Sequence, residues 1–378
     1  MSTRSSLKIG FIGGGIDSAV GYTHFVASRM DNRWELVSGC YSIDPDMNEK
    51  TGRAYGTSPD RVYGKWQDML INEKGILDAI AVLTPTPTHF NIVKACLNKG
   101  IPVLCEKALV LTSNEADELK RLLRAKKGFL AVTYNYSSYP MARELRQKIR
   151  KGLLGKILHF QAEIPQEGYI RLDSKGKKMI PQEWRLIDRK VPTLHLDLAV
   201  HLHQLINYLT DLHPTEVISN QDSLGFFPNV IDNVHCLCRY NKGVQGQLWF
   251  SKSSLGHRNG LRIRIFGSNA SAEWYQANPE ELLISYKDGK REIVDRASNN
   301  IMIANQQRYC RFKAGHPAGF IEAFANLYCD IAQCLKQYKS AGKCINDDVY
   351  GIDIASEGLR MIEAMVKSSQ IKRWQIVG

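Results

Sequence analysis

An apolar stretch near the start of the chain, 7–12, runs into the consecutive glycines Gly13 to Gly15. A buried strand that ends in glycines is typical of a phosphate-binding turn, because a backbone without Cβ atoms approaches a pyrophosphate closely and the next helix offers its free N–H groups. A second apolar strand, 35–42, follows at the distance of one βαβ unit, and Ser42 stands where the ribose-reading residue is expected. The pattern predicts a dinucleotide-binding turn.

Apolar strands and helical segments continue to alternate as far as residue 134. We expect strands at 77–83, 101–105 and 129–134, and helices at 46–55, 88–97 (capped by Thr88) and 113–125. Strands that are apolar throughout are buried on both faces, as in parallel sheets, and their alternation with helices predicts a doubly wound sheet. Residues 1–136 are therefore predicted to form a Rossmann dinucleotide-binding domain.

The pattern changes beyond residue 136, where strands become longer and alternate between polar and apolar positions. We expect strands at 157–164, 244–250 and 261–274, and helices at 141–152, 196–209, 317–337 and 347–368. Alternating polarity suits an open, mostly antiparallel sheet with one covered face. Residues 137–378 are predicted to be an α/β domain for substrate binding and oligomerisation, with the open sheet as the candidate oligomer surface.

Composition narrows the class of protein and the compartment in which we expect it. The chain is 44% hydrophobic and 23% charged, which is ordinary for a globular protein. No apolar run reaches the length of a membrane span, and Met1 to Ser6 lacks the apolar region of a signal peptide, so we expect a cytoplasmic protein with no membrane partner. The nine cysteines are interpreted as reduced core residues; for Cys236 and Cys238 a metal or redox pair is the less favoured alternative.

The formal net charge of +12 favours anionic partners such as nucleotide cofactors, phosphorylated sugars or nucleic acid. The basic residues are dispersed, however, and their densest cluster, 175–178, has no interleaved aromatic residues. No helix-turn-helix or zinc-finger spacing occurs either. We therefore expect no nucleic-acid partner.

Two candidate chemical groups follow strands of the predicted Rossmann sheet. Thr84-Pro85 comes after one strand and Glu106-Lys107 after the next, and both should lie near the glycine turn because ligands bind at the carboxyl ends of parallel strands. Strand-end lysines are usually only solvated. Beside a nicotinamide, however, the amine of Lys107 would hydrogen-bond a substrate hydroxyl and accept its proton as hydride leaves.

A histidine-rich segment, 195–203, carries the other candidate group. Asp197 and His201 are four residues apart and share one helix face, whereas His203 points elsewhere. The segment is either a buried helix with a satisfied Asp–His pair or an acid/base imidazole steadied by a carboxylate. No zincin-like spacing occurs, so no metal site is predicted.

Taken together, these motifs resemble those of the Gfo/Idh/MocA family of NAD(P)-dependent sugar and inositol oxidoreductases over essentially the whole chain. The matching segments are the strand and glycine turn (Ile9 to Gly15), Thr84-Pro85 with His89, Glu106-Lys107-Ala108, Asp197-Leu-Ala199-Val-His201, Gly315-His316-Pro317 to Phe320, and Glu322 to Asn326. The order and spacing of these motifs are more specific than any one of them.

The resemblance implies hydride transfer between nicotinamide C4 and a carbon of a sugar, cyclic polyol or nucleotide-sugar, in a homodimer or homotetramer built on the C-terminal sheet. Lys107 and His201 would share the proton transfer, and Asp197 would bind or orient the substrate. The implied cofactor-binding residues are Gly13, Gly14, Gly15, Ser42, Thr84, Pro85, His89 and Glu106. Substrate specificity is expected from side chains between about Tyr134 and Trp184 and from the sheet face.

Several positions depart from the family pattern. The third glycine of the turn is replaced by Ser18, the next glycine being Gly21, and Ala108 and Ala199 replace a proline and a glycine. Ser42 stands where NAD-preferring members carry an acidic residue, with Asp44 two positions on.

The choice between NAD and NADP stays open, because Arg53 or Arg61 would suit a 2′-phosphate. Two alternatives to a dehydrogenase also stay open. One is a non-catalytic regulator that senses a dinucleotide or sugar. The other is an enzyme with tightly held NAD that performs redox-assisted glycoside cleavage or epimerisation.

Overall fold

The computed structural model describes residues 6–378. The expectation that Met1 to Ser6 lacks the apolar region of a signal peptide therefore concerns residues that, except for Ser6, lie outside the described part. Within the described part, the chain forms two compact units. The first unit holds the residues up to 138 together with 320–356, and the second holds 139–319 together with 357–378. Among the described residues, no helix has the length and apolar character needed to cross a membrane.

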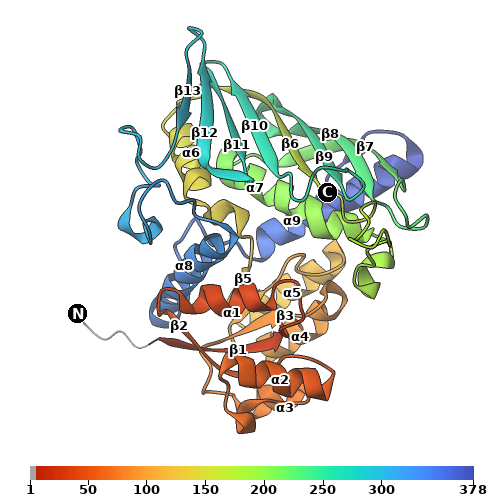
Figure 1. Ribbon diagram of the computed structural model, residues 1–378, viewed down its shortest axis with the longest axis vertical. Helices are drawn as coiled ribbons and strands as arrows, with labels where there is room; N and C mark the ends of the chain where they lie inside the picture. Colours follow the sequence, from red (N-terminus) through yellow and green to blue (C-terminus); the bar gives the residue numbers. More distant parts are fainter. Residues whose placement is uncertain (1–5) are drawn as a thin grey trace. The chain divides into compact units, whose positions relative to one another are not determined.

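The first unit contains a sheet in which every neighbouring pair of strands is parallel, in the order β2-β1-β3-β4-β5 (Figure 1). The strands are β1 (Leu7–Gly13), β2 (Trp34–Cys40), β3 (Ala79–Leu83), β4 (Val103–Cys105) and β5 (Leu130–Val132). Strands β3, β4 and β5 are buried at every position, which is why they have no polar alternation in the sequence. The predicted α/β fold with a parallel Rossmann sheet is confirmed.

The helices of this unit differ in how they begin. They are α1 (Gly21–Arg29), α2 (Pro45–Tyr55), α3 (Trp66–Asn72), α4 (Thr86–Asn98), α5 (Ser113–Ala125) and α8 (Phe320–Ala341). Helix α5 starts at a capping box in which Thr112 and Glu115 satisfy each other's backbone N–H groups. The prediction that Thr88 caps α4 is wrong. The helix begins two residues earlier, because Pro87 fits its first turn and Thr88 bonds back to the carbonyl oxygen of Pro85.

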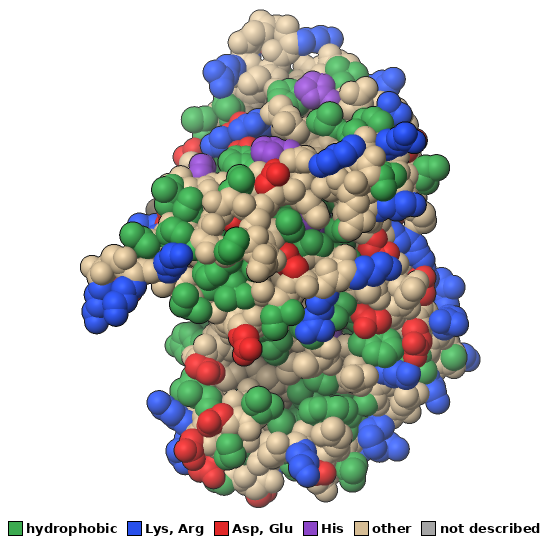
Figure 2. All heavy atoms as spheres, turned by 90° about the vertical axis from the view of Figure 1, so that its right-hand side faces the viewer, with side chains coloured by type: hydrophobic (Ala, Val, Ile, Leu, Met, Phe, Trp, Pro, Cys, Tyr) green, Lys and Arg blue, Asp and Glu red, His purple; other side chains and the backbone are tan. Residues whose placement is uncertain are grey.

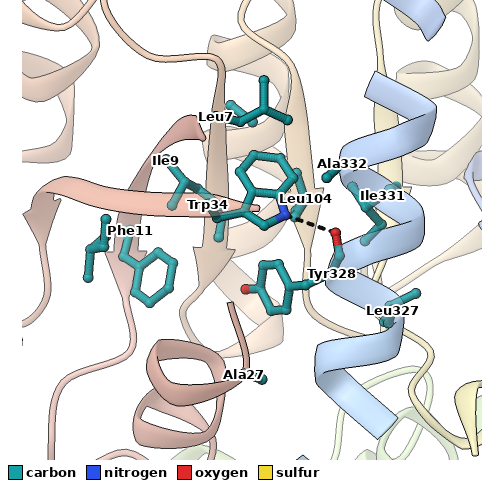
Figure 3. Close-up of a cluster of buried hydrophobic side chains, with 14 of the residues drawn as sticks. Leu7, Ile9, Phe11, Ala27, Trp34, Leu104, Leu327, Tyr328, Ile331 and Ala332 are labelled. Atoms are coloured by element: carbon teal, nitrogen blue, oxygen red, sulfur yellow. Dashed lines mark hydrogen bonds between the residues drawn. The ribbon is translucent and has the colours of Figure 1, made fainter. Parts of the chain in front are cut away.

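Helix α8 is distant in sequence from the strands it packs against. Its buried side chains join those of β1, β2 and α1 in one hydrophobic cluster, and the indole Nε1 of Trp34 donates to the carbonyl oxygen of Tyr328 at 2.8 Å (Figure 3). The structure thus groups 320–356 with the first unit, whereas the sequence analysis placed all of 137–378 in one domain. The reason is that the apolar face of α8 complements α1 and the adjacent sheet.

The second unit contains a sheet in the order β13-β12-β11-β10-β6-β9-β8-β7-β14. Its strands are β6 (Ile157–Pro165), β7 (Pro214–Asp222), β8 (Asn233–Tyr240), β9 (Gln245–Ser251), β10 (Arg262–Gly267), β11 (Ala270–Tyr275), β12 (Asn278–Tyr286), β13 (Arg291–Val294) and β14 (Gln375–Ile376). Among these described strands, β6 and β9 pair in parallel and every other neighbouring pair is antiparallel. The predicted open, mostly antiparallel sheet is confirmed.

One face of this sheet is covered by helices. They are α6 (Pro140–Arg150), α7 (Val200–Thr210) and most of α9 (Ile352–Ile371). Along β8, buried and exposed positions alternate, and Ser219 of β7 donates its hydroxyl to the carbonyl oxygen of Met365 on α9. The prediction of one strand over 261–274 is wrong: a turn after Gly267 divides it into β10 and β11, which pair as a hairpin.

The expectation that all nine cysteines are free is also wrong. Cys334 on α8 and Cys344 in the following segment form a disulfide, with Cα atoms 5.0 Å apart. The segment after α8 folds back over the end of the helix, and this brings together two cysteines whose spacing gave no sign of pairing. The other seven, all among the described residues, are free, and Cys236 and Cys238 lie with their sulfur atoms 3.5 Å apart on the buried side of β8.

Candidate functional site

The glycine turn after β1 depends on two glycines for its conformation. Gly13 and Gly14 have φ values of 80° and 77°, in the left-handed region that favours glycine. A Cβ on Gly13 would lie 2.8 Å from the backbone N of Thr84, and one on Gly14 would lie 2.7 Å from the side chain of Leu83. The end of β1 therefore approaches the end of β3 more closely than any other residue type allows. Gly15 is less constrained, since its φ is ordinary.

Gly21 allows the glycine turn and the helix that follows it to lie in close contact. It is the first residue of α1, and a Cβ there would lie 2.2 Å from the carbonyl oxygen of Gly14. Ser18, which occupies the expected third-glycine position, instead accepts a hydrogen bond at its Oγ from the backbone N of Gly21 at 2.7 Å. The inserted residues thus form a longer turn, and the third glycine of the fingerprint is Gly21. The sequence analysis missed this role.

The segment after β2 carries a carboxylate at the start of α2. The hydroxyl of Ser42 accepts from the backbone N of Asp44 at 3.1 Å, and the Asp44 carboxylate caps α2 by accepting from the backbone N of Met47 at 2.8 Å. Ser42 and Asp44 therefore form one local structure between β2 and α2. Asp44 remains exposed, so its charge faces solvent.

The two arginines considered for a 2′-phosphate both have carboxylate partners. Arg61 makes a two-point contact with Glu73, through Nε to Oε1 at 2.9 Å and Nη2 to Oε2 at 2.5 Å, and this hydrogen bonding raises the pKa of Arg61 despite partial burial. Arg53 pairs with Glu49 at 3.3 Å on the exposed side of α2. The Arg61 pair is the firmer one, because Glu73 is buried whereas both members of the other pair are exposed.

His89 hydrogen-bonds to both of the segments that follow β3 and β4. It is fully buried, with Nε2 2.7 Å from the carbonyl oxygen of Thr84 and Nδ1 3.0 Å from that of Ala108. Burial lowers its pKa, although the two carbonyl contacts oppose this. His89 therefore supports the strand ends from inside the protein. The contact to Ala108 uses the backbone oxygen, so it does not need the proline of the family pattern.

Glu106 is the centre of a buried polar array next to Lys107. Its carboxylate accepts from Thr133 and from Nε2 of His24, the latter at 3.0 Å. Burial alone would raise the pKa of Glu106, but the hydrogen bond and charge of His24, together with the charge of Lys107, outweigh it and lower the pKa to about 2. Glu106 is thus an anion beside Lys107. His24 is a second residue that the sequence analysis missed.

In the second unit, Asp197 is held by two cations. It lies in a π-helical turn, His195–Ala199, that leads into α7, and its Oδ2 accepts from both Arg185 and Lys252. Lys252 is buried, and its ammonium lies 5.1 Å from the ring centroid of Tyr169. A carboxylate paired in this way is held in one orientation.

Arg185 brings Trp184 into the same group of side chains. Its guanidinium lies 4.4 Å from the centroid of the Trp184 ring, and the hydroxyl of Tyr169 donates to its backbone oxygen at 3.1 Å. Arg185 lies 12 positions and Lys252 lies 55 positions from Asp197 in the sequence, so neither pair has a helical or strand spacing that would have pointed to it.

The three histidines of the 195–203 segment have different surroundings. His201 is buried on α7, four residues after Asp197. His203 is buried and places its Nε2 2.9 Å from Glu357 of α9, so it points to a different neighbour, in accord with the helical spacing. His195 is fully buried against Phe250, neither ring nitrogen has a hydrogen-bond partner among the described residues, and burial lowers its pKa to about 3.

Comparison with known proteins identifies the family. Residues 7–134 match an oxidoreductase family with an NAD-binding Rossmann fold, and residues 142–273 match the GFO/IDH/MocA C-terminal domain. The chain is 32% identical over 377 residues to YfiI, an uncharacterized oxidoreductase of Bacillus subtilis (strain 168), covering 96% of this chain and 94% of that protein. This chain belongs to the Gfo/Idh/MocA family.

Solved structures of similar proteins span the same length as this Gfo/Idh/MocA member. An inositol dehydrogenase homolog from Azotobacter vinelandii, in complex with NADH and myo-inositol, has a TM-score of 0.89 at 26% identity and covers 99% of this chain and 98% of its own. An oxidoreductase from Sinorhizobium meliloti has a TM-score of 0.85 at 30% identity, covering 98% and 100%. The predicted family, enzyme class and nicotinamide cofactor are confirmed: the chain is an NAD(P)-dependent oxidoreductase.

The surface of this oxidoreductase carries its charges in a mixed pattern. Figure 2 shows Lys and Arg side chains spread over the visible face, with Asp and Glu between them. Among residues 6–378, no group of three or more His, Cys, Asp or Glu side chains is arranged to hold a metal ion.

Proposed function

We propose that this enzyme oxidises a hydroxyl-bearing carbon of a sugar or cyclic polyol, such as an inositol or a nucleotide-sugar, and passes the hydride to NAD. The observation that supports this most is the edge of the Rossmann sheet. Gly13 pairs in register with Leu83 of β3, and Val82 pairs with Cys105 of β4, so the glycine turn, Thr84 and Glu106-Lys107 follow neighbouring strand ends. Dinucleotides bind at this edge of a parallel sheet.

The residues of the first unit suit the cofactor. Gly13, Gly14 and Gly21 present no side chain where the turn meets β3 and α1, and the start of α1 offers backbone N–H groups to a pyrophosphate. Thr84 and Pro85 follow β3 at the same edge, and His89 holds that segment in place. When bound there, nicotinamide supplies a hydride acceptor at C4.

Side chains of this protein carry out the proton transfer that accompanies hydride transfer. Lys107 hydrogen-bonds the substrate hydroxyl and accepts its proton as the hydride leaves, and His201 shares this proton transfer. Asp197, fixed by Arg185 and Lys252, orients the substrate through its carboxylate. Each of these assignments is tested by substitution.

We also propose that NAD is preferred over NADP. The exposed carboxylate of Asp44 stands at the ribose position and repels a 2′-phosphate, and the nearby Arg61 is bound to a buried glutamate. Ser42 contributes by holding the backbone of Asp44.

The uncovered face of the large sheet is proposed to join copies of this chain into a homodimer or homotetramer. It carries exposed apolar side chains among polar ones, including Leu237 on β8 and Ile293 on β13, together with Trp249 on β9 stacked on His235. Sedimentation of the purified protein, and of Leu237→Glu, tests this: the wild type sediments as an oligomer and the variant as a smaller species. A wild-type monomer would contradict the proposal.

We also propose that the enzyme is located in the cytoplasm.

The experiment that tests the function is a screen of polyols, sugars and nucleotide-sugars with NAD and with NADP, read by the absorbance of the reduced nicotinamide. We expect steady-state reduction with at least one member of the polyol or sugar set. Absence of turnover across the screen, with intact dinucleotide binding, would favour the regulator. Bound NADH in stoichiometric amount without steady-state reduction would favour glycoside cleavage or epimerisation with retained cofactor.

A further inference from the structure

A chain of buried hydrogen bonds connects Glu106 to a helix from the far end of the sequence. His24, on α1 and fully buried, places Nε2 3.0 Å from Glu106 Oε1 and Nδ1 2.8 Å from the hydroxyl of Tyr328 on α8. His24 and Tyr328 are 304 positions apart in sequence. The order of groups is therefore Tyr328, His24, Glu106, and then Lys107 as the next residue along the backbone.

The two ring nitrogens of His24 face different partners. Glu106 is an anion, since its pKa is lowered to about 2, so it accepts a hydrogen bond and Nε2 of His24 must donate. Burial, reinforced by the charge of Glu106, raises the pKa of Tyr328 well above its usual value, so the phenol keeps its proton while it bonds to Nδ1. The array therefore uses both ring nitrogens of His24.

Tyr328 is itself fixed in position by a second contact. Its carbonyl oxygen accepts from the indole of Trp34 at 2.8 Å, and Figure 3 shows its ring turned towards α1 and β2 from α8. The rings of Phe324 and Tyr328 also pack edge-on against His24, with centroids 4.7 and 5.8 Å from it. His24 thus has little freedom to turn away from Glu106.

We propose that His24, oriented by Tyr328, is a positioning residue for the hydride-transfer reaction: it holds the Glu106 carboxylate in one orientation beside Lys107, and so keeps a negative charge next to the amine that receives the substrate proton. The proposal rests on the proposed function only for the role of Lys107. A buried carboxylate that loses a charge-assisted donor becomes easier to protonate, and a neutral Glu106 no longer stabilises the neighbouring ammonium.

Three substitutions separate this role from simple packing. His24→Leu removes both hydrogen bonds and keeps an apolar side chain, His24→Gln keeps a donor that reaches Glu106, and Tyr328→Phe removes only the hydroxyl. Phe324→Leu is the control, because it alters the packing against His24 and leaves the array intact.

The first readout is the titration of Glu106 in the enzyme without substrate, followed by carboxyl carbon NMR with Glu106→Gln for assignment. We expect the Glu106 titration to move up by about 3 pH units or more in His24→Leu, because burial is then opposed by fewer contacts, to move less in Tyr328→Phe, and to stay near wild type in His24→Gln and Phe324→Leu. An unchanged titration in His24→Leu would overturn the proposal. If His24→Leu does not fold, an unchanged titration in Tyr328→Phe overturns it instead.

The second readout is the pH–rate profile on a substrate found in the screen. For His24→Leu we expect kcat to fall about 10-fold or more and the acid limb of the profile to move to lower pH, because the ammonium of Lys107 loses the negative charge beside it. We expect NAD affinity to stay nearly unchanged and His24→Gln to recover most of the rate. A lower melting temperature with an unshifted profile would mean a structural role only and would overturn the proposal. If the wild type turns over no substrate, the proposed function fails, while the titration still decides the role of His24 towards Glu106.

Discussion

A Cβ atom on Gly21 would lie 2.2 Å from the carbonyl oxygen of Gly14, so the first residue of α1 touches the backbone of the turn that it follows. Helix α1 can approach the turn this closely only because Gly21 lacks a side chain. This contact places the positive end of α1 at the glycine turn, where a pyrophosphate would bind.

Gly21→Ala should therefore weaken dinucleotide binding. The added methyl group meets backbone atoms, so the helix must move away, and we expect a loss of stability of about 1–3 kcal/mol and a smaller rise in melting temperature on adding NAD. Thermal shift and calorimetry measure both effects. Gly64→Ala is the matched control, since a Cβ there meets no atom within 4 Å. Equal NAD stabilisation in Gly21→Ala and wild type would show that the contact is not needed for binding.

Cofactor preference should respond to the charge at the end of β2. Asp44→Asn keeps a helix cap and removes the charge, so it should raise kcat/KM with NADP relative to NAD, whereas Ser42→Asp adds a carboxylate and should shift the ratio towards NAD. The measurement is kcat/KM with each cofactor on the same substrate. A wild type that prefers NADP, or a ratio that neither variant moves, would refute this account of selectivity.

Stability at acid pH should depend on His195. Burial lowers the pKa of this imidazole to about 3, whereas in the unfolded chain it titrates near the ordinary value of about 6.5. Between these values the unfolded state binds one more proton, so stability falls as pH falls through this window, by about 2 kcal/mol between neutral pH and pH 5. Denaturant unfolding of His195→Leu should show a pH dependence weaker by that amount.

His257→Leu serves as the control for that experiment, because His257 is exposed and should leave the pH dependence unaltered. If His195→Leu and wild type lose stability in parallel on acidification, His195 is charged in the folded protein and the account of its burial is wrong.

The site residues whose positions depend on local sequence spacing could be predicted. Gly13 to Gly15 after an apolar run, Lys107 after a strand and His203 turned away from His201 were all predicted from spacing, and the described structure places them accordingly. Residues that depend on distant partners were missed. Lys252 meets Asp197 across 55 positions, and Tyr328 meets His24 across 304.

Gly21 was missed for a different reason. The turn is longer than the fingerprint, and no local pattern showed that three extra residues could be accommodated before the close helix contact. The disulfide between Cys334 and Cys344 depends on how the segment after α8 folds back, which hydrophobic periodicity does not encode.

The central claim is that Lys107 and His201 move the proton while the glycine turn binds the dinucleotide. The most direct test compares kcat and NAD affinity in Lys107→Met and His201→Ala, with His203→Ala as the control because its partner is Glu357. We predict that each of the first two variants lowers kcat by about 10² to 10⁴ with nearly unchanged NAD affinity, while His203→Ala keeps most of the activity. Full activity in Lys107→Met, or a loss in His203→Ala that exceeds the loss in His201→Ala, would contradict the account.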